Sequence, residues 1–102
     1  MARKAYRQKR ESKMKVHIDP HSLERAEERG TDEDEIRDVI KTGFEIPARY
    51  RRKGKAKIYD YKQKRHGKFY DHKRVEVYYI IENDTIITVT VYVFYGRWEE
   101  QK

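Results

Sequence analysis

Two different spacings of apolar residues divide the chain into a helical part and a β part. Between residues 20 and 43, the apolar residues recur at the three- to four-residue spacing of a helix face; they are Leu23, Ala26, Ile36, Val39 and Ile40. This spacing predicts two short amphipathic helices, over residues 20–29 and 32–42. After Gly43 the apolar residues alternate with polar ones, which is the two-residue period of β-strands.

Residues at the ends of the two segments support these helices. Asp19 is a favourable N-cap, and Pro20 suits the first helical position, where a backbone N–H would have no partner. Gly30 can adopt a positive φ and predicts the end of the first helix. Thr31 and Asp34 resemble a capping box for the second helix.

The C-terminal part predicts a β-hairpin of residues 74–82 with residues 85–95. Asn83-Asp84 between them suits a two-residue turn. The second strand has two faces by alternation: Ile87, Val89, Val91 and Val93 on one, and Thr88, Thr90, Tyr92 and Phe94 on the other. We expect the Val side to cover the helices and the Thr/Tyr side to be open. The pattern leaves the register of the partner strand undetermined.

The middle of the chain has weaker β signals. Residues 48–61 favour two strands that turn near Lys53-Gly54. Lys62–Arg74 is polar, basic and interrupted by Gly67, which is typical of a long exposed loop or of a loosely held hairpin tip.

Composition limits the class of protein. A chain of 102 residues predicts one domain, over residues 16–98, between a basic disordered arm (residues 1–15) and a polar tail (residues 99–102). The apolar runs are too short for a membrane span and no signal peptide is recognisable, so we expect a soluble cytoplasmic protein. Charged residues make up 42% of the chain, whereas it has two Met, one Asn and three Gln, a balance typical of heat-adapted proteins.

The sequence predicts neither a metal nor a cofactor. It has no Cys, which excludes disulfides and thiolate zinc sites. The four histidines show no ligand spacing supported by carboxylates; they are His17, His21, His66 and His72.

Charge is distributed unevenly along the chain. Residues 49–74 hold twelve Lys/Arg and two Asp/Glu, whereas residues 16–48 hold four Lys/Arg and ten Asp/Glu. A local net charge of +10 is the electrostatic pattern expected of a surface that binds a phosphate backbone. The residues there that we expect to bind RNA are Arg49, Arg51, Arg52, Lys55, Lys57 and Tyr59. The arm of residues 1–15 carries +6 and is either a solubilising extension or a further RNA contact.

His21, Arg25 and Arg29 recur at i, i+4 and i+8, so they form one polar stripe on the first predicted helix. One interpretation is a solvated helix face, with ion pairs to Glu24 and Glu28. The other is an anion site, in which the two guanidinium groups hold a phosphate and His21 transfers a proton.

The motif His21-x3-Arg25-x3-Arg29-Gly30, the acid-rich second helix and the terminal strand Val89-Thr90-Val91-Tyr92 together resemble the DUF 4258 family of small domains. That family is similar to the RelE/ParE/BrnT toxin superfamily. The resemblance implies an α+β fold in which two N-terminal helices pack on a four-stranded antiparallel sheet. It also implies an RNase-like toxin activity for some relatives, with a ribosome-associated RNA target and an acidic antitoxin as partner.

An RNase of this kind needs no metal, because the ribose 2′-OH attacks the adjacent phosphate. His21 is then the acid or base, Arg25 and Arg29 hold the phosphate, and Tyr92 orients the nucleotide or stacks on a base. Two other interpretations stay open. One is an RNA- or ribosome-binding domain without turnover, which uses its many tyrosines for stacking. The other is a toxin-like scaffold that binds an acidic protein.

Overall fold

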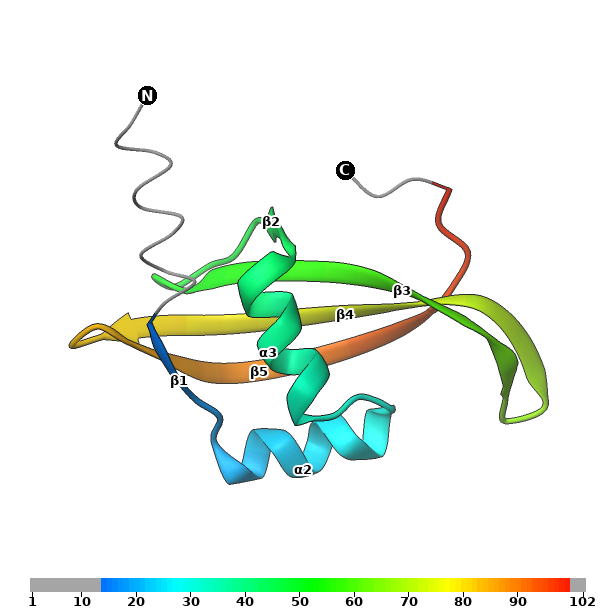
Figure 1. Cartoon of the computed structure of the whole chain (residues 1–102), viewed down its shortest axis with the longest axis horizontal. Helices are drawn as coiled ribbons and strands as arrows, with labels where there is room; N and C mark the ends of the chain where they lie inside the picture. Colours follow the sequence, from blue (N-terminus) through cyan, green and yellow to red (C-terminus); the bar gives the residue numbers. More distant parts are fainter. Residues whose placement is uncertain (1–13, 100–102) are drawn as a thin grey trace.

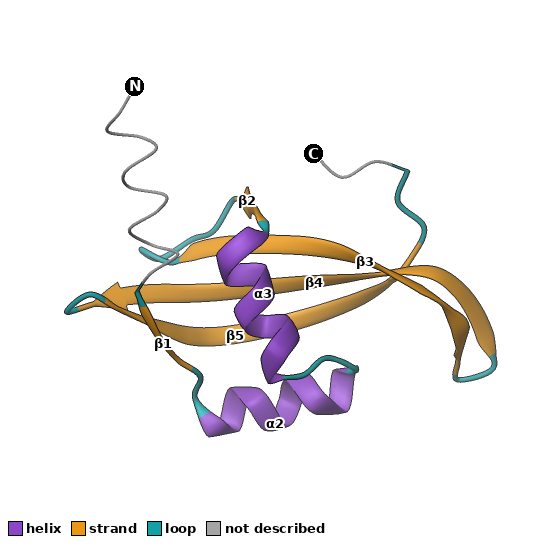
Figure 2. Ribbon diagram, viewed as in Figure 1, coloured by secondary structure: helices purple, strands orange, loops and turns teal. Residues whose placement is uncertain are grey.

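The computed structural model describes residues 14–99, which form two helices and a five-stranded sheet (Figure 1). The helices are α2 (Pro20–Arg29) and α3 (Glu33–Thr42). The strands are β1 (Lys15–His17), β2 (Phe44–Ile46), β3 (Lys53–Arg65), β4 (Lys68–Glu82) and β5 (Thr85–Gly96). Most of the described chain is strand (Figure 2). Residues 1–13 and 100–102, most of the predicted arm and tail, lie outside the described residues.

The prediction of a four-stranded antiparallel sheet is wrong. The sheet has five strands in the order β1-β5-β4-β3-β2, and it is mixed because β1 pairs in parallel with β5. Val16 lies opposite Ile86, with one neighbour paired on each side. Three residues are too few to show a period, and nothing in the local sequence identifies the distant partner β5. Lys15, assigned to the arm, begins this strand.

The middle of the chain also differs from the prediction. β3 runs through Lys53 and Gly54 without a turn, and the strand before it is the short β2. Of the two alternatives for Lys62–Arg74, the exposed loop is wrong and the hairpin tip is confirmed, because Arg65 pairs with Lys68 and the two strands continue from there as a hairpin. The backbone ladder forms here without the apolar alternation by which a strand is recognised.

The helices lie where the sequence predicts them, except that the N-cap of α3 is a different residue. The Asp19 side chain caps α2 by accepting from the Ser22 N–H at 3.1 Å, and Gly30 ends it at φ 105°. A Cβ at position 30 would overlap the Tyr95 hydroxyl, so this close approach also requires glycine. The cap of α3 is Asp32 instead of Thr31. The Thr31 hydroxyl donates to the Glu35 carboxylate, at 2.7 Å.

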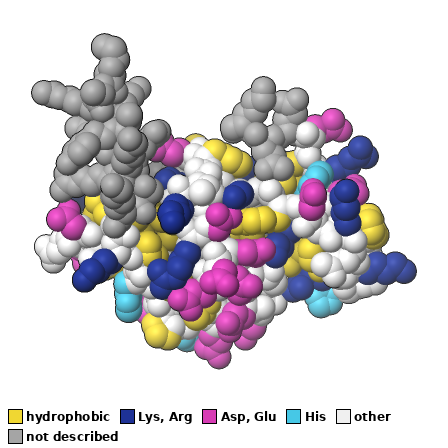
Figure 3. Space-filling model, in the orientation of Figure 1, with side chains coloured by type: hydrophobic (Ala, Val, Ile, Leu, Met, Phe, Trp, Pro, Cys, Tyr) yellow, Lys and Arg dark blue, Asp and Glu magenta, His cyan; other side chains and the backbone are white. Residues whose placement is uncertain are grey.

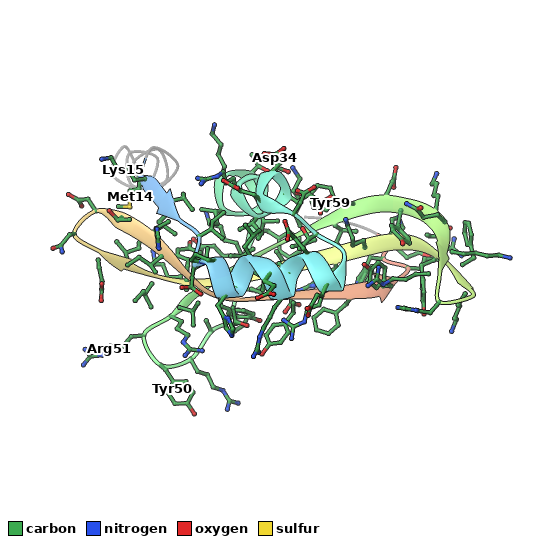
Figure 4. All side chains as sticks on the ribbon, turned by 90° about the horizontal axis from the view of Figure 1, so that it is seen from below. Met14, Lys15, Asp34, Tyr50, Arg51 and Tyr59 are labelled. Carbon is green, nitrogen blue, oxygen red and sulfur yellow. The ribbon has the colours of Figure 1, made fainter. Side chains whose placement is uncertain are left out.

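The core lies between α3 and the sheet. Ile36, Val39 and Ile40 of α3 are fully or almost fully buried. They pack with Ala26 of α2 and with the inward side chains of the sheet, which are Val75, Val77, Tyr79, Ile86 and Val91. α3 therefore covers one face of the sheet. The other face carries no helix (Figure 4).

A β-bulge reverses the faces of β5 half-way along the strand. Tyr78 pairs with Thr90 and Tyr79 with Thr88, so Val89 is an extra residue between them. Val91 faces the helices, as predicted. Before the bulge, however, the inward residues are Ile86 and Thr88, both buried, so the predictions that Ile87 faces the helices and that Thr88 lies on the open side are wrong. The extra residue cannot be recognised from the sequence, because Thr and aliphatic residues alternate through the bulge as they would in a regular strand.

A buried ammonium group joins the helix pair to the sheet. Lys73 of β4 is 8% exposed, and its Nζ donates to the Gly30 carbonyl oxygen at 2.9 Å and to Glu35 Oε1 at 2.8 Å. The carbonyl is at the break between α2 and α3, and the carboxylate is in the first turn of α3. One side chain of a central strand thus fixes the position of both helices.

We predict that Lys73→Ala lowers the free energy of unfolding by about 3 kcal/mol, because it leaves the Glu35 carboxylate without its cation under the helices. Urea denaturation followed by circular dichroism measures this change. The control is Lys64→Ala, at an exposed position of β3, which we expect to change the free energy by less than about 0.5 kcal/mol. Equal effects of the two substitutions would contradict this role of Lys73.

Candidate nucleotide-binding site

A pocket of about 230 Å³ lies between α2 and the edge of β5. It is lined by Asp19, His21, Ser22, Arg25 and Arg29 of the helical segment and by Val89, Thr90 and Val91 of the strand. The three residues of the predicted stripe therefore border one concave site. The bulged residue Val89 lies in its wall, and bulges are frequent beside functional sites.

The pocket exists because α2 runs along the sheet edge, beside β5, instead of lying over a face (Figures 1 and 4). β1 pairs with β5 only from Thr85 to Ile87. Beyond that point, side chains of α2 donate hydrogen bonds to backbone carbonyl groups of β5. The Ser22 hydroxyl donates to the Val89 carbonyl at 3.2 Å, and Arg29 Nη1 donates to the Val91 carbonyl at 2.7 Å. The strand edge is thereby capped, and the pocket is the space left between these contacts.

Arg29 has a structural role in addition to any role in binding. Besides its bond to Val91, its guanidinium carbon lies 5.5 Å from the centre of the Tyr92 ring, which is on the opposite face of the sheet from α3. Its own carbonyl accepts from the Tyr95 hydroxyl at 2.7 Å. A guanidinium has five N–H donors, so the bond to Val91 leaves others for a ligand.

His21 and Arg25 are exposed at the mouth of the pocket. In residues 14–99 neither side chain forms an ion pair with Glu24 or Glu28. The interpretation of the stripe as a solvated helix face predicted such pairs. His21 is in the first turn of α2, where the backbone N–H groups and the helix dipole favour an anion. The one carboxylate in the lining, Asp19, is held by the Ser22 N–H as the helix cap.

The six residues expected to bind RNA divide into two groups on opposite sides of the sheet. Arg49, Arg51 and Arg52 are exposed in the loop of residues 47–52, which projects on the side away from α3 (Figure 4). Lys55, Lys57 and Tyr59 of β3 point toward α3. Lys55 Nζ donates to the Ile40 carbonyl at 2.8 Å, and Lys57 Nζ and the Tyr59 hydroxyl both donate to Asp38, at 2.7 and 2.6 Å.

The basic segment is therefore not a single positive surface. Three of its cations pair with carboxylates at 2.7–2.8 Å: Lys57 with Asp38, Lys73 with Glu35 and Arg74 with Glu76. Hydrogen bonds from Lys57 and Tyr59 lower the pKa of Asp38, and burial followed by the bond to Asp38 raises the pKa of Tyr59. Acidic side chains gather over the helices in Figure 3. Exposed cations for which the described residues provide no carboxylate partner remain in the 47–52 loop and at the β3–β4 hairpin tip, for example Arg51 and Lys64.

The sequence analysis missed a polar cluster on the open face. Arg74 Nε donates to one oxygen of the Glu76 carboxylate at 2.8 Å, and the Tyr78 hydroxyl donates to the other at 3.0 Å. Burial and the bond to Glu76 raise the pKa of the Tyr78 phenol. The i, i+2, i+4 spacing of three polar residues in a strand, on one face, is the signal that could have revealed the cluster.

Exposed aromatic rings adjoin this cluster. Tyr92 lies opposite Glu76 in the register of β4 and β5, and Phe94 lies opposite Arg74. The Tyr92 ring centre is 6.0 Å from that of Tyr78, edge to face, and 6.2 Å from that of Phe94. Tyr92 and Phe94 are 42% and 47% exposed, a large fraction for rings of this size.

One family model matches residues 18–93 of the chain, and its description is a domain of unknown function, DUF4258. The match spans the helix motif, the pocket and β5 as far as Val93. The chain belongs to the DUF4258 family. No curated protein and no solved structure matches it. The kinship of this family with the RelE/ParE/BrnT toxins stays a prediction.

Two further observations concern the described part of the DUF4258 domain. None of its helices is long and apolar enough to span a membrane. Between residues 14 and 99, no group of three or more His, Cys, Asp or Glu side chains is arranged to hold a metal ion.

The two arginines of the DUF4258 motif should differ in their effect on stability. We predict that Arg29→Ala lowers the free energy of unfolding by about 1–2 kcal/mol, because the Val91 carbonyl loses its donor and the Tyr92 ring its cation. Arg25→Ala, on the same helix and exposed, should change it by less than about 0.5 kcal/mol. Urea titrations of the two variants make the comparison, and equal losses would contradict the structural role of Arg29.

Proposed function

We propose that this DUF4258 domain is a metal-independent endoribonuclease, of the kind found among RelE-like toxins, with its active centre in the pocket between α2 and β5. The observation that carries the proposal is that one imidazole and two guanidinium groups border a single pocket, next to exposed aromatic rings. The proposal places the protein in the cytoplasm, where mRNA and ribosomes are its targets and a small acidic antitoxin is its partner.

The reaction is an attack of the ribose 2′-oxygen on the adjacent phosphorus. The new 2′-O–P bond forms as the P–O5′ bond breaks, which leaves a 2′,3′-cyclic phosphate and a 5′-hydroxyl. A proton must leave the 2′-OH and another must reach O5′, and the extra negative charge on the phosphate needs cations. This chemistry requires no electron transfer and no co-reactant.

Each of the four predicted catalytic residues has a role in this proposal that follows from its position. His21 is reachable from solvent, and an imidazole can both donate and accept a proton, so it serves as the acid or the base. Arg25, exposed and without an ion pair in residues 14–99, binds the phosphate. Arg29 holds the strand edge and directs its remaining donors to the same phosphate. Tyr92 adjoins Arg29 and orients the nucleotide.

We predict that His21→Ala lowers RNA turnover by about 10²–10⁴-fold with little change in RNA affinity, because proton transfer acts in the transition state. Arg25→Ala should weaken both. The assay incubates the purified protein with structured and unstructured RNAs, with and without ribosomes, in the presence of EDTA, and identifies the product ends.

His17→Ala is the matched control, because it removes an exposed histidine of β1 that does not line the pocket. Its turnover should equal that of the wild type. Cleavage that His21→Ala leaves unchanged would remove the proposed site while keeping an RNase. Binding without cleavage in every condition would favour the alternative function.

That alternative is an RNA- or ribosome-binding domain without turnover. The observation that favours it is the loop of residues 47–52, which exposes Tyr50 (80%) together with Arg49, Arg51 and Arg52. An aromatic ring among cations suits stacking on a single strand. The same cations would also suit an acidic protein partner.

A salt titration tests whether the folded domain contributes to RNA binding. We predict that the logarithm of the association constant falls with the logarithm of salt concentration by about 0.7 per phosphate contact on single strands. Removing residues 1–13, which retains the packed Met14, should leave a substantial part of this slope. Loss of the whole slope would assign RNA binding to the N-terminal segment and not to the domain.

A further inference from the structure

The open face next to the pocket combines features that recognise a nucleotide base. It presents two exposed rings, Tyr92 and Phe94, and beside them a carboxylate, Glu76, whose side chain is only 14% exposed. The ion pair of Glu76 with Arg74 accounts for the carboxylate being tolerated there. It does not account for two large rings left open to solvent on the strand next to it.

We propose that this face is a base-specific subsite that takes a guanine of single-stranded RNA, stacked on Tyr92 and Phe94 and hydrogen-bonded through its Watson–Crick edge to Glu76. The inference rests on the proposed function in one respect: it takes the phosphate of the same nucleotide strand to lie in the pocket lined by His21, Arg25 and Arg29. It assigns the substrate class, which the pocket alone leaves open.

Arg29 makes the pocket and the subsite continuous. The guanidinium group lines the pocket, binds the carbonyl at the edge of β5, and lies 5.5 Å from the centre of the Tyr92 ring. A strand of RNA whose phosphate binds at this edge therefore reaches the open face directly at Tyr92. Bases of single-stranded RNA are commonly bound by stacking on such rings.

The choice of guanine follows from the orientation of Glu76. Arg74 holds one carboxylate oxygen and Tyr78 the other, so the group is fixed in position, and each oxygen retains a lone pair. Guanine alone presents two adjacent donors, N1–H and the N2 amino group, to a carboxylate. Adenine and cytosine present one donor beside an acceptor nitrogen, and uracil presents one donor between two carbonyls, so each would place an acceptor against the carboxylate.

Glu76 is suited to discriminate because it is largely shielded from water. Water competes weakly for a carboxylate that neighbouring side chains cover, so an unmatched base leaves it with an unfavourable contact. Tyr92 lies directly opposite Glu76 in the register. The ring that stacks on the base and the carboxylate that binds its Watson–Crick edge are therefore at adjacent positions of one face. The Tyr78 ring, edge-on to Tyr92, closes one side of the subsite.

The experiment measures binding and cleavage separately, with the full chain. Binding uses fluorescently labelled uridine-tract RNAs that carry one central guanosine, adenosine, cytidine or uridine. A 2′-deoxy sugar at that position removes the nucleophile and prevents cleavage there. Cleavage uses the same four RNAs with the ribose intact, and the cut positions are mapped.

We expect the guanosine RNA to bind at least about tenfold more tightly than the other three, since two matched hydrogen bonds to a base edge are worth that discrimination. Glu76→Gln should reduce the preference to less than about threefold, because the amide replaces one acceptor oxygen by a donor. Glu82→Gln is the control, with the same change of charge at an exposed position of β4. Thermal melting checks that both variants fold.

The outcomes separate this inference from the proposed function. A guanine preference that Glu76→Gln abolishes supports the subsite, with or without cleavage. If such a preference comes with no cleavage in any condition, the endoribonuclease proposal fails and the subsite stands. Cleavage without base preference, or a preference that survives Glu76→Gln, overturns the subsite and leaves the enzyme. Absence of any RNA binding overturns both.

Discussion

The buried ammonium group of Lys73 is the contact on which the arrangement of this DUF4258 domain depends. A cation that is 8% exposed needs partners of fixed position, and its two partners are at the break between the helices and in the first turn of α3. Because the break between α2 and α3 is held over β4, α3 crosses the face of the sheet and α2 lies beside β5. The polar motif of α2 therefore faces a strand edge and not solvent alone.

The strand edge explains why structural and chemical roles overlap in the candidate site. An uncovered edge of β5 would present unpaired carbonyls, and Ser22 and Arg29 donate to two of them. Because Arg29 is held there, its guanidinium has a defined position beside Tyr92. A side chain fixed for stability has a defined position, whereas His21 and Arg25, with no such contacts in the described chain, are exposed to solvent.

The sequence predicted the features that depend on local interactions. The bounds of α2, the glycine cap at Gly30 and the final hairpin follow from capping and periodicity, and the structure has them. Features that depend on distant partners could not be read in this way. The parallel pairing of β1, the extra residue Val89 in β5 and the inward orientation of Lys57 and Tyr59 each require knowledge of a neighbour far along the chain. The stripe His21, Arg25 and Arg29 was predicted as a group, but its second wall, the edge of β5, was not.

The contacts that close the pocket also join parts of the chain that are synthesised far apart. Asp19 with Thr88, Ser22 with Val89 and Arg29 with Val91 are separated by 69, 67 and 62 residues. Each of these contacts involves a residue of β5, so none can form before β5 has been synthesised. A nascent chain that has emerged from the ribosome only as far as β4 already carries the whole His-Arg-Arg motif, but it has no pocket. The pocket can therefore form only after the last strand of the domain has been synthesised.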